Sequence, residues 1–104
     1  SSISTKRGKA GYAVYAAAKS ALIGLTKSLA IELNPTKVNC LVIGAVITKT
    51  TQNIIKGKEE ILNSHIPLGL PNSSVLNEWV MFLIDKGIWM TGQEVIIDGG
   101  ATVL

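Results

Sequence analysis

A long segment, residues 14–33, carries apolar side chains at the spacing of an α-helix. Its bulky positions recur every three or four residues, at Leu22, Leu25, Leu29 and Leu33. Small residues form a second stripe on another face, at Ala17, Ala21, Gly24 and Ser28. Asn34-Pro35 ends the pattern, because proline cannot continue a helix. A helix with two non-polar faces is predicted to be buried on both sides, by a sheet and by another helix or subunit.

Four further elements follow from shorter patterns. Residues 37–44, KVNCLVIG, form an apolar, β-branched run that ends at glycine and predicts a fully buried strand. Residues 53–64 predict a weak, polar helix, and residues 73–85 predict a helix capped by Ser73 or Ser74. Residues 94–97 predict a second strand, after which Asp98 shapes a turn. Residues 1–13 are rich in Ser, Lys and Gly and predict a loop.

The order helix–strand–helix–helix–strand is typical of an α/β fold with parallel strands. Both predicted strands have apolar residues on both faces, which requires flanking strands and helix layers. Two strands cannot build such a sheet alone, and the sequence starts SSIST without an initiator methionine. We therefore expect the chain to be part of a longer protein.

Composition narrows the function classes. Of the 104 residues, 47% are apolar and 16% charged, which favours a folded domain over a disordered chain. The net charge of +3 is small, and its one cluster (Lys6, Arg7 and Lys9) predicts a solvated loop, with nucleic-acid binding as the minor alternative. The single Cys40 excludes an internal disulfide and a multi-cysteine metal site, and its apolar surroundings predict a buried structural cysteine. With no signal-peptide pattern and no apolar run of about 18 residues, we expect a soluble, cytoplasmic protein that does not span a membrane.

The stretch YAVYAAAK, residues 12–19, carries candidate chemistry. Tyr15 and Lys19 are four residues apart and share one face of the predicted helix. A nearby ammonium group favours the phenolate and lowers the pKa of a tyrosine from about 10 towards the range of an acid/base catalyst. The spacing alone is a weak signal, because such pairs arise often by chance on helix surfaces.

The residues that follow the pair, together with three stretches further along the chain, give it a context. YAAAKSALIGLTKSLAIEL, VNCLVIGAVIT and TGQEVIIDGG follow one another in the chain, with IPLGLP between the last two. In this order they resemble the C-terminal half of the short-chain dehydrogenase/reductase family. The resemblance implies part of a Rossmann-type, doubly wound parallel sheet that is incomplete without its N-terminal half. Residues 1–104 would then be the C-terminal catalytic half of one domain, whose dinucleotide-binding half is absent.

The resemblance also implies an NAD- or NADP-dependent oxidoreductase that interconverts a carbonyl and an alcohol. Ser2 stands thirteen positions before Tyr15 and matches the family's catalytic serine, which binds the substrate oxygen. Tyr15 would exchange the proton with the substrate oxygen. Lys19 would lower the pKa of Tyr15 and bind the nicotinamide ribose.

Three positions at and just after the end of the first predicted strand match cofactor contacts of the family: Gly44, Val46 and Thr48. Gly44 would let the backbone pass close to the cofactor, Val46 would pair with the nicotinamide carboxamide, and Thr48 would contact the carboxamide or the pyrophosphate side. Two positions depart from the family pattern: Ile43 replaces a proline, and Leu70 replaces an arginine.

Tyr12 is the alternative proton donor. Six residues separate Tyr12 from Lys19, which is the spacing found in the enoyl reductases of the same superfamily. The position of Ser2 and the one-turn spacing to Lys19 favour Tyr15, and Tyr12 is then an aromatic residue over the substrate pocket.

Within the family, the YAAAKSALIGLTKSLA stretch looks most like the 3-oxoacyl-(acyl-carrier-protein) reductases of fatty acid biosynthesis. Such enzymes act on small-molecule substrates and are commonly homotetramers or dimers. The non-enzymatic alternative is an inactive remnant that only self-associates through its apolar helix faces.

Overall fold

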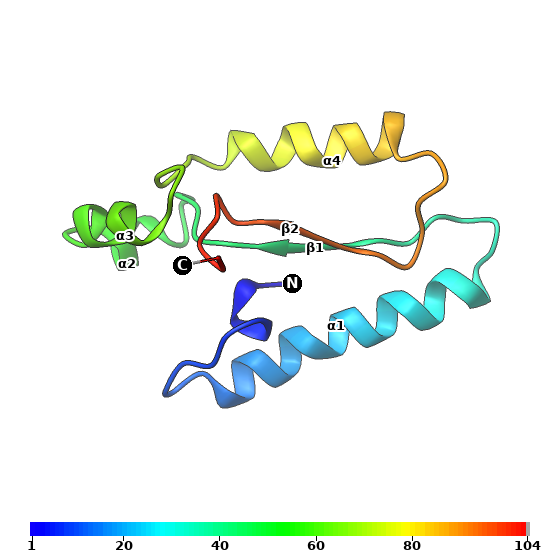
Figure 1. The fold of residues 1–104 in the computed structure, drawn as a ribbon, viewed down its shortest axis with the longest axis horizontal. Helices are drawn as coiled ribbons and strands as arrows, with labels where there is room; N and C mark the ends of the chain where they lie inside the picture. The colour runs from blue at the N-terminus through cyan, green and yellow to red at the C-terminus, as the bar shows by residue number, and fades with distance from the viewer. Residues whose placement is uncertain (104) are drawn as a thin grey trace. The chain divides into compact units, whose positions relative to one another are not determined.

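The computed structural model describes residues 1–103 and is drawn in Figure 1. Its elements are, in chain order, η1 (Ile3–Thr5), α1 (Ala13–Glu32), β1 (Cys40–Ile43), α2 (Gln52–Ile55), α3 (Glu59–His65), α4 (Ser74–Lys86) and β2 (Glu94–Ile97). They divide between two compact units. The first unit comprises residues 1–44 and 89–97, and the second comprises residues 45–88 and those from 98 onward.

The first unit is built on a parallel sheet. β1 pairs with β2 in a register that runs from Cys40 opposite Glu94 to Ile43 opposite Ile97. The predicted parallel strands are therefore confirmed, and β2 has the predicted bounds. β1 is shorter than predicted, because the preceding Asn39 binds the neighbouring turn with its side chain. Its amide nitrogen donates to the Met90 carbonyl (3.0 Å), and its oxygen accepts from the Gln93 amide (3.1 Å).

Buried and half-buried residues alternate along β1. Val42 is fully buried and Cys40 is buried as a free thiol, which confirms the structural cysteine. The full burial predicted for β1 is met only in part, because Leu41 and Ile43 are half-buried, and on β2 Ile96 is 46% exposed. The apolar residues that the pattern places on both faces find too few partners here to cover them.

Helix α1 confirms the predicted long helix almost to the residue and lies along the sheet of the first unit (Figure 1). Its buried residues are Thr26 and Ala30, which are small enough for close approach. The leucine stripe is largely exposed: Leu22, Leu25 and Leu33 are each at least 40% exposed. Within residues 1–103 this face is therefore uncovered, and its burial by another helix or subunit stays a prediction.

By length and hydropathy alone, α1 could also cross a membrane. A helix that packs on the sheet of a soluble protein passes the same test. Because α1 contacts η1 and β1 in the first unit, we interpret it as a sheet-packing helix.

The second unit differs from the prediction at two places. The expected helix over residues 53–64 is two helices, α2 and α3, which are separated at Gly57, whose φ is +81°. A positive φ is easy for glycine and ends the helical pattern. The cap of α4 comes from Asn72, whose side-chain oxygen accepts from the Ser74 amide (3.0 Å), and not from Ser73 or Ser74.

The predicted turn at Asp98 is confirmed. Its carboxylate accepts from the Gly100 amide (2.9 Å) and from the Thr102 amide (2.8 Å). Burial raises the pKa of Asp98, but these hydrogen bonds outweigh it and lower the pKa below the ordinary value. Asp98 is therefore a structural acceptor, held ionised by the turn that it closes.

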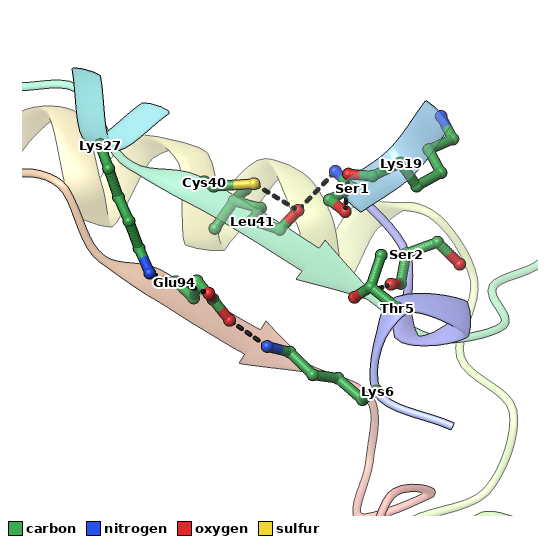
Figure 2. A network of polar contacts seen from close by, with 9 residues as sticks. All are labelled: Ser1, Ser2, Thr5, Lys6, Lys19, Lys27, Cys40, Leu41 and Glu94. Carbon is green, nitrogen blue, oxygen red and sulfur yellow. Dashed lines mark hydrogen bonds and ion pairs between the residues drawn. The ribbon is translucent and has the colours of Figure 1, made fainter. Parts of the chain in front are cut away.

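Glu94 joins three segments of the first unit (Figure 2). Its carboxylate forms an ion pair with Lys6, just after η1, and its other oxygen lies 3.7 Å from the Lys27 ammonium on α1. The hydrogen bond from Lys6 is the main cause that lowers the pKa of Glu94. Lys6, predicted as part of a solvated cluster, is instead bound to the sheet.

Glu94→Gln tests this contact through its pH dependence. Since the folded-state pKa of Glu94 lies below its ordinary value of 4.5, the contribution is present above that value and is lost as the pH falls through the folded-state pKa. We expect the urea midpoint of the variant to lie below that of the wild type at neutral pH and to converge with it in acid. Glu32→Gln, at the exposed end of α1, is the control. A gap between Glu94→Gln and wild type that stays constant as the pH falls below 4.5 would contradict the assignment.

Candidate active site

The predicted site residues of the first unit gather near the carboxyl ends of the parallel strands. The Ser1 nitrogen donates to the Leu41 carbonyl (2.7 Å), and the Ile43 amide donates to the Ser1 carbonyl (3.3 Å). A parallel bridge between Ser2 and Ile43 continues this pairing. Residues 1–5, predicted as loop, thus extend the sheet and then form η1. Ligands of open α/β sheets bind at this edge.

Gly44 follows the last residue of β1, and its amide donates to the Ile97 carbonyl (3.0 Å). The replacement of the family's proline by Ile43 has a visible consequence here. Ile43 has an N–H group, which makes the bond to Ser1, and a proline could not donate it.

Tyr15 and Lys19 lie on one face of α1, as the spacing predicts. The Lys19 ammonium lies 5.6 Å from the centroid of the Tyr15 ring. Tyr15 stands in the first turn of the helix, where the backbone dipole favours negative charge. Tyr15 is 45% exposed in the described chain.

Tyr12 occupies the residue just before α1 and packs edge-on against Tyr15, with the ring centroids 5.7 Å apart. The Tyr12 ring makes a cation–π contact with Lys9, whose ammonium lies 4.5 Å from the ring centroid. The ring contact of Lys19 is with Tyr15 and that of Lys9 is with Tyr12, which favours the Tyr15–Lys19 pair.

Ser1 makes contacts that the sequence did not predict. Its hydroxyl donates to the backbone carbonyl of Lys19 (2.9 Å), so one residue binds both β1 and the turn of α1 that carries the lysine (Figure 2). The only signal in the sequence is a second serine beside Ser2. Ser2 itself turns the chain into η1, with its hydroxyl accepting from the Ser4 amide (3.2 Å).

In the second unit, Val46 and Thr48 lie in the loop before α2. The Thr48 hydroxyl is 2.9 Å from the Thr51 hydroxyl, and the Val46 carbonyl accepts from the latter (2.7 Å). The loop therefore has a defined shape that rests on its own side chains. Among residues 1–103, no group of three or more His, Cys, Asp or Glu side chains is placed to hold a metal ion.

Comparison with known proteins matches residues 1–102 to a family model described as enoyl-(acyl carrier protein) reductase. A solved short-chain dehydrogenase/reductase from Brucella melitensis superposes with a TM-score of 0.89 and 29% identity, over 97% of this chain and 42% of that one. The chain belongs to the short-chain dehydrogenase/reductase family. Its α/β fold is accordingly part of the Rossmann-type sheet of that family, as predicted.

Curated relatives in the family carry related names. The chain is 40% identical to 3-oxoacyl-(acyl-carrier-protein) reductase of Chlamydia pneumoniae, over 97% of this chain and 42% of the relative. It is 35% identical to carbonyl reductase family member 4 of Xenopus laevis, over 95% and 42%. The chain thus spans less than half the length of these oxidoreductase relatives.

Solved structures of the family include cofactor complexes. A small-chain dehydrogenase in complex with NADPH has a TM-score of 0.90 and 28% identity, over 100% of this chain and 49% of that one. A 4-hydroxyisoleucine dehydrogenase complexed with NADH has a TM-score of 0.90 and 30% identity, over 100% and 45%.

Tyr15→Phe and Tyr12→Phe, made in the full-length protein, decide between the two tyrosines. We expect Tyr15→Phe to lower kcat for carbonyl reduction at least about 100-fold, because it removes the proton donor but keeps the ring. Tyr12→Phe keeps the edge-on ring contact and should stay within a few-fold of the wild type. The reverse ranking in steady-state kinetics would assign the proton to Tyr12.

Proposed function

We propose that this chain is the C-terminal catalytic part of an NAD(P)-dependent oxidoreductase that interconverts a carbonyl and an alcohol. The observation that carries the proposal is the Tyr15–Lys19 pair in the first turns of α1, bound through Ser1 to the strand end where Ser2 lies. Family membership supports the same chemistry, since the named relatives are reductases and dehydrogenases.

Each unit carries groups that suit a nicotinamide cofactor. In the first unit, Lys19 offers three N–H donors for ribose hydroxyls, and Gly44 offers backbone groups. In the second unit, Val46 offers backbone groups, and Thr48 offers a hydroxyl to the carboxamide or pyrophosphate side. When bound, the cofactor supplies or takes up the hydride. The NADPH and NADH complexes of the two structural relatives support either form of the cofactor.

The protein residues handle the proton and the substrate oxygen. The Ser2 hydroxyl binds that oxygen and orients the carbonyl. Tyr15 donates its phenolic proton to the oxygen during reduction and takes it back during oxidation. The Lys19 ammonium and the N-terminal end of α1 stabilise the phenolate that remains.

For the substrate we propose a 3-oxoacyl thioester, because 3-oxoacyl-(acyl-carrier-protein) reductases recur among the relatives. We further propose that the full-length protein is a homo-oligomer. Apolar side chains stand exposed on α1 and α4, among them Ile31 (81%), Phe82 (52%) and Ile84 (65%). The same exposed faces favour the second candidate, an inactive chain that only self-associates.

A substrate comparison tests the proposal. With NADPH or NADH, the full-length protein should reduce a 3-oxoacyl thioester and leave the matching trans-2-enoyl thioester unchanged. The reaction is measured by the loss of absorbance of the reduced cofactor. Tyr15→Phe serves as the inactive control. Reduction of the enoyl thioester alone would support the Tyr12 arrangement, and the absence of saturable cofactor binding would support the self-associating alternative.

A further inference from the structure

The loop before α2 is organised by one hydroxyl, that of Thr51. Thr51 Oγ1 lies 2.7 Å from the Val46 carbonyl, 2.9 Å from the Thr48 amide nitrogen and 2.9 Å from Thr48 Oγ1. The Thr51 amide in turn donates to Thr48 Oγ1 (3.1 Å). Thr51 thus contacts both residues of this loop that are proposed to meet the cofactor.

The two threonines also form a reciprocal pair at the start of α2. The Thr51 amide donates to Thr48 Oγ1, the Thr48 amide donates to Thr51 Oγ1, and the Gln52 amide donates to the Thr48 carbonyl (2.8 Å). This is the bond pattern of a capping box, in which two side chains satisfy each other's backbone amides. The further bond from Thr51 to the Val46 carbonyl connects this pair to the preceding loop.

Counting hydrogens fixes the direction of each bond. A hydroxyl has one hydrogen and two lone pairs. Thr51 gives its hydrogen to the Val46 carbonyl, which can only accept. In the contact between the two hydroxyls, Thr48 is therefore the donor. Both lone pairs of Thr51 are then used by the Thr48 amide and the Thr48 hydroxyl.

The same count leaves the Thr48 hydroxyl with one unused position for a hydrogen bond. Its hydrogen goes to Thr51, and one of its lone pairs accepts from the Thr51 amide. One lone pair remains, so the Thr48 hydroxyl can accept a hydrogen bond from a ligand but cannot donate one without breaking the network. A carboxamide NH2 group can satisfy this acceptor, whereas pyrophosphate oxygens offer only lone pairs.

We propose that Thr51 is a positioning residue, which holds the Thr48 hydroxyl as an acceptor for the carboxamide NH2 group of a nicotinamide cofactor. This inference rests on the proposed function, because it assumes that the loop binds such a cofactor. It assigns Thr48 to the carboxamide and not to the pyrophosphate side. Thr51 itself touches no ligand and acts through Thr48 and the Val46 carbonyl.

The first test measures binding of the reduced cofactor to the full-length protein through the fluorescence of the cofactor. Thr51→Val keeps the side-chain shape and removes the hydroxyl, so Kd should rise about tenfold. Thr51→Ser restores the hydroxyl and should stay within about threefold of the wild type. Thr50→Val, the exposed neighbouring threonine, is the matched control and should not change Kd. If the Val variant is unstable, Thr51→Ala removes the same hydroxyl with a smaller side chain.

An analogue lacking the NH2 group gives the second test. 3-Acetylpyridine adenine dinucleotide carries a methyl ketone in place of the carboxamide and cannot donate to Thr48. We expect the wild type to bind it about tenfold more weakly than NAD, in competition with the reduced cofactor, and we expect this difference to disappear in Thr51→Val. A residue that only stabilises the fold would weaken both ligands equally.

The outcomes separate the two proposals. If the wild type binds neither NADH nor NADPH, the proposed function fails and the role of Thr51 fails with it. If the wild type binds but Thr51→Val binds equally well, or keeps the full preference for the carboxamide, only the assignment of Thr51 is overturned.

Discussion

The pairing of Ser1 and Ser2 with the end of β1 is the constraint on which the site of the first unit depends. Its backbone bonds to Leu41 and Ile43 fix the segment along the strand, and its hydroxyl bond to the Lys19 carbonyl fixes the strand against α1. A mid-helix carbonyl already accepts one bond within the helix, so this second bond adds no capping. Its effect is to set the distance between the segment that carries Ser2 and the turn that carries Lys19.

Two other contacts complete this arrangement. Glu94 binds Lys6 and Lys27, and so holds the chain after η1 and the middle of α1 to β2. Gly44 continues the ladder to Ile97 and starts the loop that leads to Thr48. Beyond that point, the loop takes its shape from its own threonines. The site residues thus rest on backbone pairing and short polar contacts more than on a large apolar core, which in the described chain is small.

The sequence predicts most of this fold because long periodic patterns dominate it. α1, β2 and the parallel direction follow from apolar spacing and element order. Short features carry no such pattern: the pairing of Ser1 and Ser2 spans two residues, and the break at Gly57 depends on a single positive φ. The leucine stripe shows a further limit, because periodicity tells which residues share a helix face but not what covers that face. The Tyr15–Lys19 pair became specific only through the motifs around it, and its chemistry remains a prediction.

Replacing Lys19 tests the central claim most directly, since the proton transfer proposed for Tyr15 and the proposed ribose contact both depend on that side chain. Lys19→Met in the full-length protein removes the ammonium but keeps the length of the side chain, and Lys58→Met, at an exposed lysine just before α3, is the control. The account predicts that carbonyl reduction by Lys19→Met falls at least about 100-fold while Lys58→Met stays near the wild type. Activity in Lys19→Met equal to that of Lys58→Met would contradict it.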